Sequence, residues 1–292
     1  MPDKREKPTH KMQNSVKSKN SDFTIRIKPK SSWLKIDFKE LWNYREVFYL
    51  LVWRDLKVRY KQTLLGILWV ALQPVIATVI FAVIFTRFAR FETDTIPYAL
   101  IALSGFTLWS FINTAVSQAS ISLVYHEQLV TKIYFPRMIV PSASVGAGLI
   151  DLILTFLILL GIMFFYGVFP TLKILLVPFV LFFAVLITLS FSLLLASLNV
   201  RFRDVKFIVP FFLQIWMFAS PVFYPSTWIP ERFRPIFALN PVTGLIDSFR
   251  YVLYGTELNL TNFGISAAMA LVLFFVSLFV FRAMEDDFAD LL

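Results

Sequence analysis

The chain has 292 residues, of which 58% are hydrophobic and 16% are charged, and its mean hydropathy is +0.70. Soluble domains carry roughly 25% charged residues, so this composition excludes a water-soluble fold. The absence of cysteine excludes disulfides and thiol chemistry, and the two histidines, His10 and His126, offer no metal-binding cluster. We therefore predict an integral membrane protein without a metal.

Long uncharged stretches follow one another along the chain. Each can cross a hydrocarbon core of ~30 Å, which takes about 20 helical residues, and none alternates with the period of two typical of a barrel strand. Because a bilayer offers no hydrogen-bond partners to the backbone, we expect helices. The predicted fold is all-α, with six membrane spans at about 63–86, 98–125, 139–166, 174–200, 207–228 and 261–281.

The charge is concentrated before the first span. Residues 1–61 hold 16 of the 28 Lys and Arg against 7 acidic residues, a net charge of +9 that equals that of the whole chain. A basic flank belongs in the cytoplasm, and an even number of spans returns the C-terminus there. We predict that residues 1–37 are a disordered tail and that 283–292 are an acidic cytoplasmic tail. For the basic tail, a role in topology and attraction to anionic lipid is favoured over nucleic-acid binding.

Residues 38–61 are too charged to span a membrane but are periodic enough for a helix that lies on its surface. At 100° per residue, six polar side chains share one arc and five apolar side chains lie opposite. The polar set is Lys39, Asn43, Glu46, Arg54, Lys57 and Lys61, and the apolar set is Leu41, Tyr44, Phe48, Leu51 and Val52. We predict an interfacial amphipathic helix.

Two connecting segments are also distinctive. Residues 126–137, HEQLVTKIYFPR, alternate polar and apolar positions as a short two-faced helix would. Residues 231–257 contain an uncharged run of only twelve residues with two prolines, which is too short to span a membrane. That run could enter the bilayer as re-entrant helices, provided that protein covers its backbone.

No catalytic motif appears. The sequence lacks a P-loop, an H-E-x-x-H pattern and a G-x-S-x-G pattern, and its carboxylates are scattered or gathered near the C-terminus. We therefore predict that this chain is not an enzyme.

Aromatic and polar residues within the spans favour transport. Phe212, Trp216 and Phe223 are predicted to share one face of the fifth span, and aromatic faces can stack on sugar rings; the alternative is packing in the core. Trp69 with Gln73, and Trp109 with Asn113, are weaker candidates for a channel lining. Asp151 is the one ionisable residue well inside a predicted span, so it needs a partner or water. It either contacts the substrate or fixes the packing of helices. Pro210, Pro221 and Pro225 are expected to bend or interrupt the fifth span.

Four segments carry a resemblance to a known family. They are RDLKVRYKQTLLGILWVALQPV at 54–75, KIYFPRMIVPSASV at 132–145, LNVRFRDVKFIVPFFLQIWMFASPVFYP at 198–225 and ALNPVTGLIDSFR at 238–250. In this order and spacing they resemble the ABC-2 type permeases that export O-antigen, capsule or teichoic acid. The likeness runs from about residue 38 to residue 282.

The resemblance implies a homodimer in the bacterial inner membrane, with residues 62–282 as the transmembrane domain. It implies two copies of a separate ATPase subunit, which binds ATP and Mg, while this chain carries no cofactor. The implied substrate is a polyprenyl-diphosphate-linked polysaccharide in contact with membrane lipid. In the family the segment at 231–257 is a re-entrant pair.

The resemblance also assigns candidate site residues. A channel along the first, second and fifth spans would be lined by Trp69, Gln73, Trp109, Phe212, Trp216, Phe223 and Tyr224. A coupling helix that docks on the ATPase would present His126, Glu127, Lys132, Tyr134, Phe135 and Arg137. At the cytoplasmic mouth of the first span, the lipid diphosphate could be attracted by Arg54, Lys57, Arg59 and Lys61, whose alternative role is topology alone.

Three alternatives stay open at this point. An ABC-2 type exporter of a small molecule or drug shares every feature above. A membrane-embedded glycan or lipid transferase would explain the aromatic and basic residues, but it should show clustered carboxylates facing the membrane surface. A passive channel would conduct without an ATPase.

Overall fold

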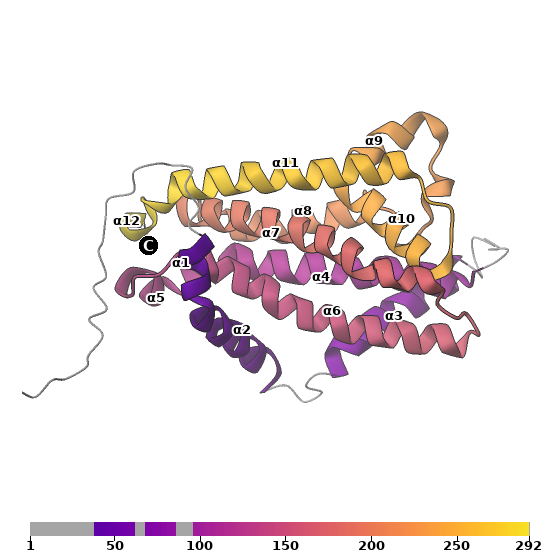
Figure 1. The fold of residues 1–292 in the computed structure, drawn as a ribbon, viewed down its shortest axis with the longest axis horizontal. Helices are drawn as coiled ribbons and strands as arrows, with labels where there is room; N and C mark the ends of the chain where they lie inside the picture. The colour runs from indigo at the N-terminus through magenta and orange to yellow at the C-terminus, as the bar shows by residue number, and fades with distance from the viewer. Residues whose placement is uncertain (1–37, 62–67, 86–95, 292) are drawn as a thin grey trace, which may run out of the picture. The chain divides into compact units, whose positions relative to one another are not determined.

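The computed structural model describes residues 38–61, 68–85 and 96–291, and within these ranges it consists of helices and turns without a strand. The predicted tail at 1–37 and parts of the first predicted span lie outside the described residues. The elements in chain order (Figure 1) are α1 (Phe38–Asn43), α2 (Arg45–Tyr60), α3 (Leu68–Val83), α4 (Tyr98–Tyr125), α5 (Glu127–Lys132), α6 (Ile139–Phe165), η2 (Leu172–Leu176), α7 (Val177–Arg201), α8 (Val205–Phe218), η3 (Ser226–Trp228), η4 (Glu231–Phe233), α9 (Arg234–Ala238), α10 (Pro241–Tyr254), α11 (Leu260–Glu285) and α12 (Phe288–Leu291).

Four helices of the described chain are long and apolar enough to cross a membrane: α4, α6, α7 together with η2, and α11. The other two predicted spans correspond to shorter apolar helices. At 1.5 Å per residue, the 16 residues of α3 and the 14 residues of α8 extend about 24 and 21 Å. Both fall short of a ~30 Å core.

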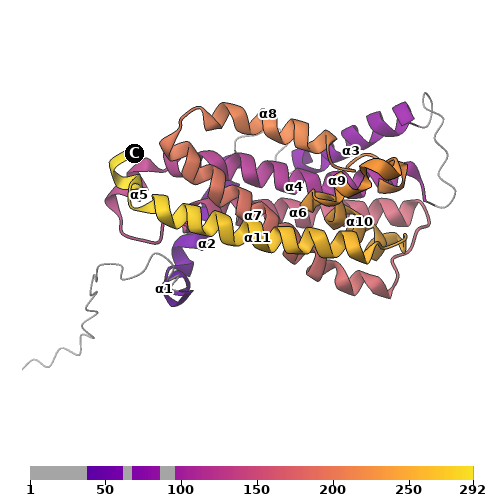
Figure 2. The same cartoon turned by 90° about the horizontal axis from the view of Figure 1, so that it is seen from above.

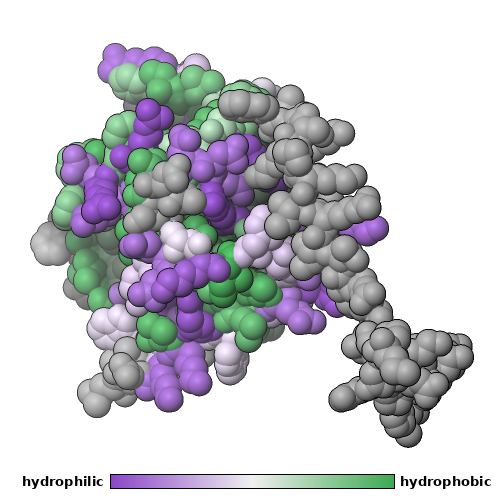
Figure 3. Space-filling view, turned by 90° about the vertical axis from the view of Figure 1, so that its left-hand side faces the viewer, coloured by the Kyte–Doolittle hydropathy of each residue, from purple (hydrophilic) through white to green (hydrophobic). Residues whose placement is uncertain are grey.

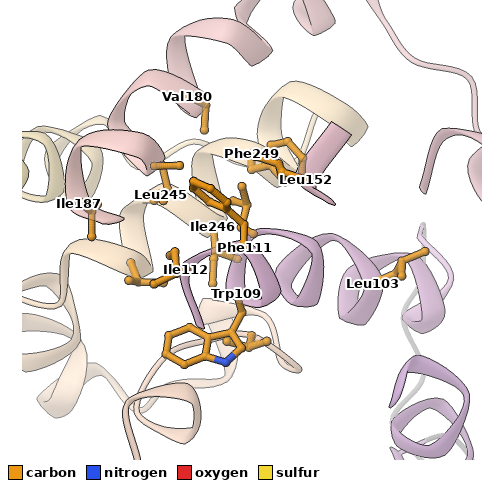
Figure 4. Packing of buried hydrophobic residues seen from close by; sticks show 14 of the residues in the cluster. Leu103, Trp109, Phe111, Ile112, Leu152, Val180, Ile187, Leu245, Ile246 and Phe249 are labelled. Atoms are coloured by element: carbon orange, nitrogen blue, oxygen red, sulfur yellow. The ribbon is translucent and has the colours of Figure 1, made fainter. Parts of the chain in front are cut away.

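The core is built around α4. Its Ile112, Ala115 and Ala119 have no exposed surface. A Cβ added at Gly148 of α6 would lie 3.1 Å from the Cβ of Ala115, so the small residues allow the two helices to approach closely. Figure 4 shows Phe111 of α4 beside the side chains of α6 and α10 in this core. The core therefore leaves only one stripe of α4 uncovered.

Helix α2 packs its apolar side on α6. Leu51 and Leu56 are buried, and a Cβ at Gly146 of α6 would come within 2.8 Å of the ring of Phe48. The helix predicted over 38–61 is divided at Tyr44, between α1 and α2. A second apolar face points outward. It comprises Trp42, Tyr49, Leu50, Trp53 and Val58, all at least 67% exposed. The prediction of one polar and one apolar face was therefore incomplete.

The predicted fifth span is shorter than expected. Helix α8 ends at Phe218 rather than near residue 228, because the residue before a proline disfavours helical backbone and Ser220 precedes Pro221. The following chain forms turns, η3, η4, α9 and α10 instead of a continuous span. At the other end, the acidic C-terminal segment continues the fold as α12, whose Phe288 is fully buried against Phe281.

Seen from above, α3 and α8 lie on one side of α4, and α11 lies on the other (Figure 2). The end of the bundle that carries α5 and α12 is shown in Figure 3, where hydrophilic side chains cover much of the face. Exposed polar residues such as Glu127 and Lys132 belong to this end. We call it the α5 end.

Candidate functional site

The uncovered stripe of α4 is polar along its middle. Its partly exposed residues recur every three or four positions, as one helical face requires. From residue 106 onward they are Phe106, Ser110, Asn113, Thr114, Ser117, Gln118, Ile121, Val124 and Tyr125. We call the five central residues, Ser110, Asn113, Thr114, Ser117 and Gln118, the polar stripe. Polar side chains inside a span face protein or water rather than acyl chains, so the polar stripe borders a polar path or a partner.

Two cavities follow this stripe. The end cavity, of about 520 Å³, lies among α2, α4 and α6 near the α5 end and is lined by Arg54, Gln118, His126 and their neighbours. The inner cavity, of about 120 Å³, lies deeper and is lined by Trp69 and Gln73 of α3 together with Ser110 of α4. The predicted pair Trp69 and Gln73 therefore lies beside the polar stripe, and both residues are exposed in the single chain.

A polar cluster stands where the cavities meet. The Arg59 guanidinium and the Tyr60 hydroxyl of α2 both donate hydrogen bonds to the carboxylate of Asp151 on α6. The side chains of Arg59 and Asp151 are 22% and 13% exposed. Burial, followed by the hydrogen bond to Asp151, raises the pKa of Tyr60 to about 12, so its hydroxyl stays protonated. The partner that Asp151 was predicted to need is therefore the Arg59 cation of α2.

The other basic candidates at this end have different surroundings. Arg54 pairs with the adjacent Asp55 at 3.0 Å while 41% of its side chain is exposed. Lys57 and Lys61 are exposed. Of the four basic candidates, Arg54 and Arg59 therefore line the end cavity.

Trp109 and Trp216 are not placed as predicted. Trp109 is 2% and Trp216 is 8% exposed, and their rings meet edge to face at 5.6 Å. Phe191 of α7 lies 4.5 Å from the Trp216 ring. Both indoles are therefore packed inside the chain and do not line an open channel in this structure. Phe212 lies beside this cluster and is 37% exposed.

The prediction that Phe223 continues the face of Phe212 and Trp216 is also wrong, because α8 ends before it. Phe223 is buried and stacks on Phe81 of α3 at 3.7 Å. The Tyr224 hydroxyl donates to the carbonyl of Phe218 at 3.2 Å. Phe223 therefore joins the turn after α8 to α3, and Tyr224 bonds that turn to the end of α8 itself.

Sequence reasoning missed two residues that hold the turn after α8. Arg250 of α10 is 3% exposed and donates to the carbonyls of Val222, Tyr224 and Ile101 at 2.9 to 3.0 Å. Asn240 accepts from the Trp216 indole at 3.0 Å and donates to the carbonyl of Ala219 at the end of α8. The available signal was a lone cation, Arg250, three residues after Asp247 in an apolar helix.

The predicted coupling segment is only partly open to a partner. Glu127, Lys132 and Tyr134 are exposed. His126 and Phe135, by contrast, are buried, which corrects their assignment as docking residues.

Two contacts tie this segment to the bundle. The guanidinium of Arg137 donates to the carbonyl of Glu285 on α11, so Arg137 supports the fold rather than offering a free contact. Burial lowers the pKa of His126, whose Nδ1 lies 2.7 Å from the Ser122 carbonyl.

No group of three His, Cys, Asp or Glu side chains in the described part of the chain is placed to hold a metal ion. The site is therefore built from amides, hydroxyls, aromatic rings and a few paired charges.

Comparison with known proteins places the chain in a family. The model of the ABC-2 type transporter family matches residues 46–254. The chain is 31% identical to an O-antigen export system permease protein RfbA of Myxococcus xanthus, over 86% of this chain and 97% of that protein. It is 28% identical to a protein of the same name from Klebsiella pneumoniae, over 88% of this chain and all of that one. The chain therefore belongs to the ABC-2 type transporter family.

Proposed function

We propose that this chain is the permease subunit of an ABC exporter that moves a polyprenyl-diphosphate-linked polysaccharide of the O-antigen type out across the bacterial inner membrane. Family membership and the names of the similar permeases support the class of transporter. The observation that carries the proposal is the polar stripe of α4. A long hydroxylated polymer needs hydrogen-bonding groups along its path, and the stripe supplies them inside a span.

A second copy of the chain would complete the path. The exposed sides of α3 and α8, which lie on the same side of α4 (Figure 2), are apolar, with Ile76 and Val79 on α3 and Phe211 and Ile215 on α8. Two such surfaces can pack against those of another copy, with the polar stripes facing each other. This arrangement keeps the glycan between the two chains and away from lipid.

The remaining spans and the orientation follow from the same proposal. We count α3 and α8 as the first and fifth of six spans, with η4, α9 and α10 as a re-entrant outer segment. The basic flank places both termini and the α5 end in the cytoplasm. There, two copies of a separate ATPase would bind ATP and Mg and contact the exposed Glu127, Lys132 and Tyr134 around α5.

The end cavity would receive the lipid diphosphate. Arg54 and Arg59 line it, and Lys57 and Lys61 are exposed cations of the same segment of the chain. A guanidinium offers parallel donors to phosphate oxygens, whereas a lysine acts as a point charge. The polymer would then follow the polar stripe from this cavity.

The test is to make the stripe apolar and measure export. Asn113→Leu combined with Gln118→Leu should lower transport of a labelled lipid-linked glycan at least tenfold in proteoliposomes that contain the ATPase. Phe275→Leu, at an exposed position of α11 away from the polar stripe, is the control and should transport normally.

Normal export by the Asn113 and Gln118 variant would refute the path. Transport of small solutes without any glycan transport would favour a drug exporter, and flux without the ATPase would favour a passive channel. Transfer of sugar between lipids would indicate a transferase.

A further inference from the structure

Arg59 belongs to both cavities. Its side chain lines the end cavity and also the inner cavity, and its guanidinium is bonded to Asp151, which lines only the inner one. The Arg59 and Asp151 pair, with Tyr60 beside it, thus stands between the α5 end and the deeper part of the polar stripe. Whatever moves Arg59 changes the connection between the two cavities.

The end cavity is suited to an anion. Three of its lining side chains, Arg54, Arg59 and His126, are basic, against the single carboxylate of Asp55. Arg54 donates to Asp55 through Nη2 at 3.0 Å and keeps 41% of its side chain exposed. Ser122, Ser144 and Gln118 add hydroxyl and amide groups to the lining, and Val58, Ile121 and Tyr125 form its remaining part.

A buried polar atom also points to a ligand. His126 is 9% exposed, and its Nδ1 is engaged by the Ser122 carbonyl. Its Nε2 is buried without a hydrogen-bond partner among the described residues. A buried polar atom without a partner is costly. A protonated phosphoryl oxygen could donate to it, or a phosphate could accept from the imidazolium.

We propose that the end cavity binds a phosphoryl group, which draws Arg59 away from Asp151 and so opens the end cavity to the inner cavity. This inference rests on the proposed function, because it takes the lipid diphosphate as the physiological anion. Asp151 is then a positioning residue that holds Arg59 across the path until an anion replaces it.

The exchange is chemically balanced. A phosphoryl group accepts two parallel bonds from a guanidinium and carries more charge than one carboxylate, so it competes well for Arg59. When Arg59 leaves, Asp151 keeps the hydrogen bond from the Tyr60 hydroxyl. The carboxylate is therefore not left without a donor, and the ion pair can break and reform during each transport cycle.

Accessibility of a single cysteine tests the exchange, because the native chain has none. Ser110→Cys places a thiol in the inner cavity, and Gln118→Cys places one in the end cavity two turns along the same stripe. Both are labelled with a membrane-impermeant maleimide added to inverted membrane vesicles that hold the full chain and its ATPase. Inorganic pyrophosphate and vesicle-borne undecaprenyl diphosphate serve as separate probes.

We expect the thiol at position 110 to label slowly, and at least tenfold faster with pyrophosphate or the lipid diphosphate. The thiol at position 118 should label fast without a probe and more slowly with one. A response to the lipid alone would show that the headgroup must arrive on its carrier. In Asp151→Asn, position 110 should label fast with or without pyrophosphate. Fast labelling of position 110 in the parent chain, or no change with either probe, would overturn the proposal.

A charge exchange separates gating from simple packing. Arg59→Asp combined with Asp151→Arg restores an ion pair between α2 and α6 but removes the cation from the end cavity. We expect this variant to match the parent in size-exclusion profile and melting temperature, and to show no response to pyrophosphate. A parental response would mean that the pair only joins two helices. If the parent complex exports glycan but neither probe changes the labelling of its thiols, the gate is refuted and the proposed function stands. If the parent complex exports no glycan, the proposed function is refuted.

Discussion

The replacement Arg250→Gln should destabilise the outer segment strongly. Arg250 is 3% exposed and donates to three backbone carbonyls, two of them in the turn that follows α8. Its guanidinium also lies 3.9 Å from the carboxylate of Asp247, whose side chain is 14% exposed. A glutamine is too short to reach all of these acceptors and leaves the carboxylate without its cation.

The magnitude follows from these contacts. Hydrogen bonds from a charged donor contribute about 1.5–3 kcal/mol each and are not additive, and removing one partner of a buried ion pair costs about 3–5 kcal/mol. We therefore expect a loss of about 4 kcal/mol. At roughly 2–4 °C per kcal/mol for a chain of this size, the melting temperature should fall by about 10 °C.

The assay is thermal unfolding of the detergent-purified chain, followed by size-exclusion chromatography after heating. Arg234→Gln is a matched control in the same outer segment. Its side chain is 50% exposed, and its partner Glu231 lies 3.6 Å away at 89% exposure, so the pair contributes about 0–1 kcal/mol. If the melting temperatures of the two variants differ by less than about 3 °C, Arg250 does not hold the outer segment.

Three further predictions concern the α5 end and the packing of α2 on α6. Gly146→Val should displace α2 at a cost of about 1–3 kcal/mol, because its Cβ would lie 2.8 Å from the Phe48 ring. A lower melting temperature would show this cost. The control Gly161→Val has open space around its Cβ and should leave the melting temperature nearly unchanged. Burial lowers the pKa of His126 from 6.5, so its contribution to stability is complete above about pH 6.5 and is lost as the pH falls. The melting temperature of His126→Gln should therefore change less between pH 7.5 and pH 5.5 than that of the parent chain. An unchanged dependence of the melting temperature on pH would contradict the assignment. Glu127→Lys should lower ATP hydrolysis of the assembled complex severalfold without changing the melting temperature, since Glu127 is exposed, and full hydrolysis would exclude this surface from coupling.

The spacing of polar residues in the sequence already contains the polar stripe of α4. Ser110, Asn113, Thr114, Ser117 and Gln118 recur at intervals of three and four, so their common face could have been predicted. The prediction paired Trp109 with Asn113 instead. The two residues lie one turn apart, but Trp109 is buried against Trp216, whereas Asn113 keeps exposed surface at the edge of the stripe. Helical periodicity predicts which residues share a face, but only the neighbouring helices decide which face is covered.

The end of the fifth predicted span was harder to place. Residues 219–228 carry no charge, so an uncharged window extends past the real end of α8 at Phe218. The turn depends on contacts from distant residues. Asn240 satisfies the Ala219 carbonyl, and Arg250 satisfies those of Val222 and Tyr224. Such partners are not visible in a local window.

By itself, the sequence determined that this protein is helical and lies in a membrane, because hydropathy is a local property of the chain. It also led to the family through four blocks in a fixed order. The tertiary structure alone decided which side chains meet. Arg59 and Asp151 are 92 residues apart and form one ion pair, and packing of α2 on α6 brings them together. The site exists only because of that packing, since its charges and polar groups come from helices that lie far apart in the sequence.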